Sequence, residues 1–330
     1  MEHRILGRTG LTISALGFGC GNVGGLMVRG TPAERERAVA RAVELGINYF
    51  DTAPLYGNGE SELNLGAVLK ALRPDVVVGT KFRVAPDEQG RIGAAVAESL
   101  EASLRRLGAE RVDLLQLHNL VSLDGRERSL DVRVVLDEVV PALDALRRQG
   151  KIRYYGITAL GDTPALHRVI DARVFDTAQV CLNLLNPSAV MPLPPGFPAH
   201  DFGGLLDRTR DAAMGTIGIR VLAAGALSGV ATRHPVAVPS VDPIASGRDY
   251  TADVARARRL EALVKEGHAG SLVEASLRFA IASPALTTVL VGYSSLEHLE
   301  YAAACVNKGP LPRVALERLA ALWRDLVRDA

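Results

Sequence analysis

Short runs of β-branched and other apolar residues alternate eight times with longer amphipathic segments along this chain of 330 residues. Each run is apolar enough to be buried on both faces, which is typical of parallel strands. The strands are expected at residues 16–19, 47–50, 76–80, 112–117, 152–157, 175–180, 217–222 and 288–291. Repeated strand–helix alternation of this kind predicts an α/β fold, a (β/α)8 TIM barrel. No linker or composition shift divides the chain, so we expect residues 1–330 to form a single barrel domain.

The helices between these strands have recognisable ends. Thr31 and Glu34 form a capping box with proline at the first helical position, and Gly46 is suited to end that helix. Ser271 and Glu274 form a second box ahead of a later helix. Another helix is expected where apolar residues recur at spacings of four, four and three, at Val96, Leu100, Leu104 and Leu107.

Three segments depart from the alternation. Residues 4–6 and 11–13 flank a glycine-rich turn, which predicts an N-terminal β-hairpin that closes the bottom of the barrel. Residues 183–203 and 228–250 are rich in proline and lack periodicity, so long ordered loops are expected after strands 6 and 7. In a barrel both loops would leave the carboxyl ends of strands, where active sites lie.

Composition excludes several classes of protein. The 38 basic and 37 acidic residues leave a net charge of +1, so neither a nucleic acid nor an anionic membrane is an expected partner. No apolar run reaches the ~18 residues of a membrane span, and the first residues lack a signal peptide's apolar stretch, so a cytoplasmic protein is expected. Oligomeric state is not predicted. An odd number of distant cysteines argues against disulfides and a clustered metal site: Cys20, Cys181 and Cys305.

Polar residues stand where successive strands end. Asp51 follows the second strand, with Tyr56 five residues later, Lys81 follows the third strand, and His118 follows the fourth. Singly, each has a plain structural interpretation: a buried ion pair, a loop anchor or a core histidine. In a barrel, however, all four converge on one mouth, which favours a functional site.

Lys81 supports this interpretation, because only five of the 38 basic residues are lysine. A lysine directly after a buried strand is a poor candidate for surface charge, and a buried ammonium needs a carboxylate such as Asp51. Free tyrosine titrates near ~10, and a cation within ~4–6 Å stabilises its phenolate. We therefore expect Tyr56 to act as a general acid toward a carbonyl oxygen, which His118 would orient.

These residues occur in motifs that resemble those of the aldo-keto reductases over almost the whole chain. Residues 50–57, Phe-Asp-Thr-Ala-Pro-Leu-Tyr-Gly, are similar to the family's Asp-Thr-Ala-x-x-Tyr-Gly motif, and residues 59–66 resemble its next segment. Thr80-Lys81 and Leu117-His118 match the lysine and histidine of the family's tetrad, and residues 6–19 resemble its opening. The resemblance implies a barrel enzyme that interconverts carbonyl and alcohol with NAD(P), with Tyr56 as general acid/base.

The resemblance also implies a dinucleotide across the barrel mouth. Residues 19–24 have Gly-x-Gly-x-x-Gly spacing, but no proper helix start follows, so this motif alone is weak evidence for dinucleotide binding. Thr158 and Gln179 match the carboxamide-binding positions, and residues 225–229 and 292–295 match the segments near the phosphates. We further hypothesise that Arg220 reaches the pyrophosphate. The expected cofactor-binding residues are Gly21, Asn22, Thr158, Gln179, Arg220, Leu222, Gly225, Leu227, Gly229, Gly292, Ser294, Ser295 and His298. NADP(H) is favoured, and NAD(H) is the competitor because the last segment lacks lysine and arginine.

The substrate is expected to be a small aldehyde, ketone, sugar or the corresponding alcohol, because little chain remains after the final helix to wall a deep pocket. Two alternatives stay open. Lys81 would serve a Schiff-base lyase or aldolase, although the Asp51 anion favours a protonated lysine. A non-catalytic NAD(P)-binding regulatory subunit would bind the dinucleotide without turnover.

Overall fold

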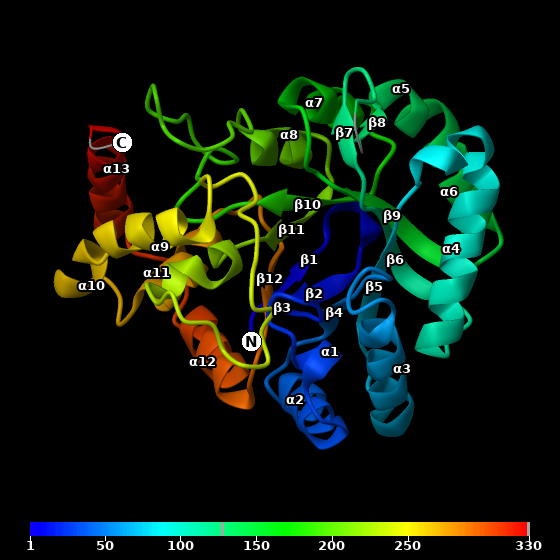
Figure 1. Ribbon diagram of the computed structural model, residues 1–330, viewed down its shortest axis with the longest axis horizontal. Helices are drawn as coiled ribbons and strands as arrows, with labels where there is room; N and C mark the ends of the chain where they lie inside the picture. The colour runs from blue at the N-terminus through cyan, green and yellow to red at the C-terminus, as the bar shows by residue number, and fades with distance from the viewer. Residues whose placement is uncertain (127–128, 329–330) are drawn as a thin grey trace.

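Eight parallel strands close into a barrel in the computed structural model, which describes residues 1–126 and 129–328. The strands are β3 (Leu16–Gly19), β4 (Tyr49–Asp51), β5 (Val77–Phe82), β6 (Val112–Leu117), β9 (Ile152–Thr158), β10 (Thr177–Cys181), β11 (Gly215–Ile219) and β12 (Thr288–Gly292). Their order around the barrel is β10-β11-β12-β3-β4-β5-β6-β9. Helices surround the strands (Figure 1), so the predicted (β/α)8 architecture is confirmed.

A helix follows each of the eight barrel strands along the chain. These helices are α2 (Pro32–Glu44), α3 (Glu60–Leu72), α4 (Ile92–Leu107), α6 (Val140–Arg148), α7 (Thr163–Asp171), α8 (Leu205–Asp211), α11 (Leu272–Ala280) and α12 (Leu296–Asn307). The additional helices and turns are η1 (Gly7–Thr9), α1 (Leu26–Arg29), η2 (Pro86–Arg91), α5 (Val132–Val134), η3 (Val135–Val139), η4 (Ala223–Ser228), α9 (Tyr250–Arg259), α10 (Ala262–Lys265) and α13 (Arg313–Arg328). Among the described residues, no helix combines the length and apolar character needed to span a bilayer.

The capping residues explain where two helices begin. At α2, the Thr31 hydroxyl accepts from the Glu34 N–H at 3.3 Å and the Glu34 carboxylate accepts from the Thr31 N–H at 2.7 Å, as predicted. At α11 only half of the box forms. Ser271 accepts from the Glu274 N–H, whereas the Glu274 carboxylate accepts from the Gly270 N–H and pairs with Arg278 on its own helix.

The bounds predicted for the seventh barrel strand, residues 217–222, are wrong. In the structure this strand, β11, covers residues 215–219. The backbone of Arg220 adopts a left-handed conformation with φ of +55°, which cannot continue a strand. Arg220 and Leu222 therefore lie in the turn after the strand and not within it. The apolar pair at 221 and 222 extended the sequence pattern beyond the strand's true end.

The N-terminal hairpin closes the bottom of the barrel, as predicted. β1 (His3–Ile5) pairs antiparallel with β2 (Thr12–Ser14), with Arg4 opposite Ile13. The hairpin buries Leu6, Leu11 and Ile13 against side chains in the barrel interior: Tyr49, Val77, Leu114, Ile217 and Leu290. Gly215 is required at this contact, because a Cβ there would lie 2.5 Å from Leu6 Cγ.

The two long loops leave the carboxyl ends of β10 and β11, also as predicted. The loop of residues 229–249 reaches the turn that follows β3. The Val238 N–H donates to the Asn22 carbonyl at 3.3 Å, and Arg29 Nε donates to the Val236 carbonyl at 2.7 Å. A smaller strand pair, β7 (Leu120–Ser122) and β8 (Ser129–Asp131), lies in the segment after β6. The segments that follow β3, β6, β10 and β11 thus border the mouth of the barrel.

Candidate active site

The four polar residues predicted from the strand ends lie together at the mouth of the barrel. Asp51 is the last residue of β4, Lys81 is the penultimate residue of β5, and His118 follows β6 directly. Tyr56 comes from the loop after β4. The strands are neighbours in the order β4-β5-β6, so their ends present these side chains side by side.

Lys81 links the carboxylate to the tyrosine. Its Nζ donates to Asp51 Oδ1, to the Thr52 carbonyl at 2.9 Å and to the Tyr56 hydroxyl at 3.1 Å. The side chain is only 1% exposed. Burial acts to lower the pKa of Lys81, but Asp51 and Tyr56 together outweigh burial and the pKa lies above its ordinary value. The ammonium therefore stays charged beside the phenol.

His118 is held in its neutral form. Its ring lies edge-to-face with Tyr56, with 6.2 Å between ring centroids. Burial, followed by the positive charges of Lys81 and Arg83, lowers the pKa of His118 to about 3. A neutral imidazole at the mouth offers one N–H donor and one acceptor, which suits it to orient an oxygen atom and not to supply a proton.

Gln179 and Thr158 also join this cluster. Gln179 Nε2 donates to Asp51 Oδ2 at 2.7 Å, and Thr158 Oγ1 donates to Gln179 Oε1 at 3.3 Å. The sequence assigned both residues to the cofactor alone. Gln179 thus contacts Asp51 directly, and Thr158 is linked to it through Gln179, because β9 and β10 point alternate side chains into the barrel.

Tyr49 is a contact residue of the site that the sequence reasoning missed. Its hydroxyl donates to Asp51 Oδ2 at 3.1 Å from the barrel interior. The available sign was its spacing, since residues two apart on a strand share a face. In the sequence, Tyr49 stands inside the apolar run of residues 47–50, and that run indicates only a strand.

The turn after β3 forms one rim of the mouth. Gly21 lies against Tyr56, because a Cβ at Gly21 would be 3.5 Å from the phenol ring. Asn22 Oδ1 is buried and has no partner among the described residues. A buried acceptor without a donor is uncommon in native proteins and fits a site that a ligand completes.

The segment after β11 forms another part of the rim, since only β12 separates β11 from β3 in the barrel. Arg220, Ala223 and Ala224 all have positive φ, a strained conformation that is concentrated at ligand-binding segments. Arg220 Nη1 donates to the Asp242 carbonyl at 3.2 Å.

The remaining residues expected in this segment are engaged within the chain. The N–H groups of Gly225, Leu227 and Gly229 donate to carbonyls of the same segment. Leu222 and Leu227 pack against the core.

The start of α12 brings together the last expected residues. Gly292 is exposed at the end of β12. The Ser294 hydroxyl donates to the Gly24 carbonyl at 2.7 Å, and Ser295 caps α12 by accepting from the His298 N–H. The His298 ring contacts that of His234, with centroids 5.6 Å apart.

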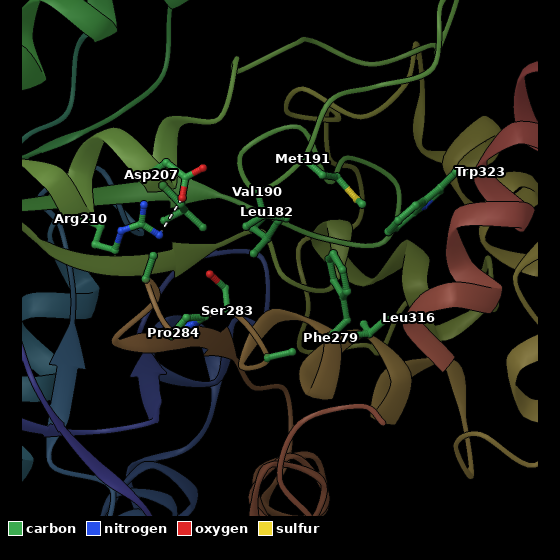
Figure 2. Close-up of a pocket in the computed structure, with 13 residues that line it drawn as sticks. Leu182, Val190, Met191, Asp207, Arg210, Phe279, Ser283, Pro284, Leu316 and Trp323 are labelled. Carbon is green, nitrogen blue, oxygen red and sulfur yellow. Dashed lines mark ion pairs between the residues drawn. The ribbon is translucent and has the colours of Figure 1, made fainter. Parts of the chain in front are cut away.

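A cavity of about 300 Å³ lies elsewhere, between α8, α11 and α13. Figure 2 shows Trp323 and Phe279 on one side of this cavity, and an ion pair between Asp207 and Arg210 on the other. No residue of the Asp51 cluster lines it. The cavity is therefore separate from the Asp51 cluster at the barrel mouth.

A buried ammonium–carboxylate pair that contacts a tyrosine, with a neutral histidine beside it, is an arrangement that can support proton transfer at the mouth of a (β/α)8 barrel. The model of the aldo/keto reductase family matches residues 15–324, so the chain belongs to that family of NAD(P)-dependent oxidoreductases.

The known proteins that this chain resembles agree with the family. It is 31% identical to the L-galactose dehydrogenase of Arabidopsis thaliana over 316 residues, covering 93% of this chain and 89% of that protein. It is 36% identical to a D-threo-aldose 1-dehydrogenase of Pseudomonas over 181 residues, 46% of this chain and 51% of that protein. A solved aldo-keto reductase from Bacillus halodurans, in its holo form, superimposes with a TM-score of 0.72 at 25% identity, covering 98% of this chain and 96% of that one.

Proposed function

We propose that this protein interconverts a small carbonyl compound and its alcohol, with Tyr56 as the general acid/base. The contact that carries the proposal is the 3.1 Å hydrogen bond from Lys81 Nζ to the Tyr56 hydroxyl, made while Lys81 is paired with Asp51. A fixed positive charge at this distance stabilises the phenolate that forms when Tyr56 releases its proton.

Each residue of the cluster has a separate role. In reduction, Tyr56 gives its proton to the carbonyl oxygen, and in oxidation it takes the proton of the alcohol. Lys81 holds its charge beside the phenol, and Asp51 keeps Lys81 charged and in place. The neutral His118 donates a hydrogen bond that fixes the substrate oxygen next to Tyr56. A bound nicotinamide dinucleotide supplies the hydride in reduction and accepts it in oxidation.

The residues that would hold the dinucleotide border the same mouth. Thr158, Gln179 and the unpartnered Asn22 Oδ1 are suited to the amide of the nicotinamide, and Arg220 is suited to the pyrophosphate. NADP(H) is the favoured form. It is supported by the family resemblance, and His298 in the first turn of α12, with His234 from the loop after β11 beside it, is the candidate contact for the 2′-phosphate. The absence of lysine and arginine at residues 292–298 supports NAD(H).

The substrate class that we favour is a sugar or a similar small hydroxylated aldehyde or alcohol. Support comes from the two relatives, which are named as dehydrogenases of L-galactose and of D-threo-aldoses. A panel of aldoses, simple aldehydes and the corresponding alcohols, assayed with NADPH, NADH and their oxidised forms, would define the substrate, the direction and the cofactor.

Tyr56→Phe tests the proposal, because phenylalanine keeps the ring and removes the acid. We expect kcat to fall by at least about a hundredfold while dinucleotide affinity stays within a factor of about two. Wild-type turnover in this variant would overturn the assignment. Trapping of a carbonyl substrate on Lys81 by borohydride would instead favour the Schiff-base alternative, and dinucleotide binding without turnover of any substrate would favour the regulatory subunit.

A further inference from the structure

The Asp51 carboxylate is held by three buried donors. Oδ1 takes the Lys81 ammonium, while Oδ2 takes Gln179 Nε2 at 2.7 Å and the Tyr49 hydroxyl at 3.1 Å. Tyr49, Lys81 and Gln179 are each no more than 1% exposed. The carboxylate's second oxygen is therefore fixed from below by a tyrosine that has no route to substrate.

The barrel interior is shaped to admit this tyrosine. The two strands that flank β4 each place a glycine beside the ring. A Cβ on Gly79 would lie 2.8 Å from the Tyr49 hydroxyl, and a Cβ on Gly17 would lie 3.1 Å from the ring. Phenylalanine would fill the same space without burying a hydroxyl, so packing alone does not account for the tyrosine.

The hydroxyl acts as a donor under all ordinary conditions. Burial, together with the neighbouring Asp51 charge, raises the pKa of Tyr49 well above its usual range. A hydrogen bond to a charged acceptor is roughly twice as strong as one between neutral groups. The contact thus draws negative charge toward Oδ2 and away from Lys81.

We propose that Tyr49 is a positioning residue of the reaction, which orients Asp51 and limits how far the carboxylate neutralises Lys81. The proposal rests on the function proposed above. With the donor in place, more of the Lys81 charge remains available to the Tyr56 phenolate. Without it, Asp51 becomes a stronger acceptor for Lys81, the phenolate is less stabilised, and alcohol oxidation requires a higher pH.

Other ionisable groups face this cluster, and the Tyr49→Phe substitution does not replace any of them. Lys81, His118 and Arg220 lie around Tyr56, and Cys20 lies beside Asp51. Burial keeps the Cys20 thiol protonated by raising its pKa, and the pKa of His118 is near 3. Neither group titrates in the alkaline range in which the oxidation profile is measured.

The experiment is Tyr49→Phe, with Tyr155→Phe as the matched control. Tyr155 is also buried and donates to an aspartate, Asp144, at 2.9 Å, but it lies outside the barrel interior. For Tyr49→Phe we expect the rise of kcat for alcohol oxidation with increasing pH to shift to higher pH by roughly half a unit or more. KM should stay nearly constant. Tyr155→Phe should leave the profile in place.

The outcomes separate this inference from the proposed function. A Tyr49→Phe profile that coincides with wild type, even with a lowered melting temperature, would assign Tyr49 a purely structural role and overturn the proposal. If instead the wild-type enzyme shows no Tyr56-dependent turnover of any carbonyl or alcohol, it is the proposed function that fails.

Discussion

Gln179 Nε2 donates a hydrogen bond of 2.7 Å to Asp51 Oδ2, and the two side chains reach this contact from opposite walls of the barrel. Their strands, β10 and β4, are four positions apart in the closed order of eight strands and so face one another. A residue that the family resemblance assigns to the nicotinamide therefore also holds the Asp51 carboxylate. Under the proposed function, one amide side chain would connect the cofactor side of the mouth with the proton-transfer side.

Gln179→Glu would place a second carboxyl against Asp51, and two carboxylates this close cannot both ionise without cost. The pKa of the new group would be raised on folding, whereas in the unfolded chain it titrates near ~4.3. The unfolded state then releases its proton first, so the variant should lose stability as pH rises from about 4 to 7. Denaturant unfolding at pH 5 and pH 7.5 measures this loss, with Gln89→Glu on the surface as control. Equal losses at both pH values would contradict the explanation.

Lys81→Met would leave Asp51 buried without its cation. We expect turnover to vanish and the free energy of unfolding to fall by about 3–5 kcal/mol, because an uncompensated buried charge is strongly destabilising. Adding Asp51→Asn removes that charge, so the double variant should recover much of the stability and none of the activity. Guanidinium unfolding of the wild type and of these two variants tests this. Equal stability of the single and double variants would show that the pair is not coupled.

The sequence predicted the barrel and its tetrad because both follow from local patterns. Parallel strands buried on both faces appear as apolar runs, so a polar residue directly after a run is conspicuous, as Asp51, Lys81 and His118 are. Their convergence then follows from barrel geometry alone. The hairpin and both long loops were similarly visible as glycine-rich or proline-rich breaks in the alternation.

What the sequence did not predict depends on contacts between distant segments. The end of β11 is set by the left-handed backbone of Arg220, which no local propensity indicates. The contact of Gln179 with Asp51 forms only because opposite walls of the barrel meet, whereas Tyr49 lies two residues before Asp51 on the same strand. Similarly, only the approach of β12 to the β3 turn engages the Ser294 hydroxyl with Gly24.

His118 should make the protein less stable in acid. Its pKa is about 3 in the folded state and near ~6.5 when unfolded, so only the unfolded chain gains this proton between those values. Stability is therefore complete above about pH 6.5 and declines toward pH 3, with a limiting slope of roughly 1.4 kcal/mol per pH unit. His118→Gln should flatten that part of the stability profile relative to wild type. An unchanged slope would show that His118 is not held neutral by the fold.

Arg220→Ala tests the hypothesis that this guanidinium binds the pyrophosphate. Burial lowers the pKa of Arg220, but a guanidinium stays charged at neutral pH. Within the described part of the chain its side chain donates one hydrogen bond, to the Asp242 carbonyl, which leaves other N–H groups for an anion. Dinucleotide affinity at low salt should fall about tenfold or more, equally for NADP+ and NAD+, because both carry the pyrophosphate. Unchanged Kd values in calorimetric titration would refute the hypothesis.

His298→Arg should separate the two cofactors. His298 lies in the first turn of α12, and burial, followed by the neighbouring His234, lowers its pKa, so the ring is largely neutral at pH 7.5. Arginine at this position is always charged and binds phosphate through two parallel hydrogen bonds. We expect the Kd for NADP+ to fall by about tenfold while that for NAD+ stays constant, with His3→Arg on the surface as control. Tightening of both cofactors by the same factor would indicate a general gain of positive charge, and no change in either would place the 2′-phosphate away from α12.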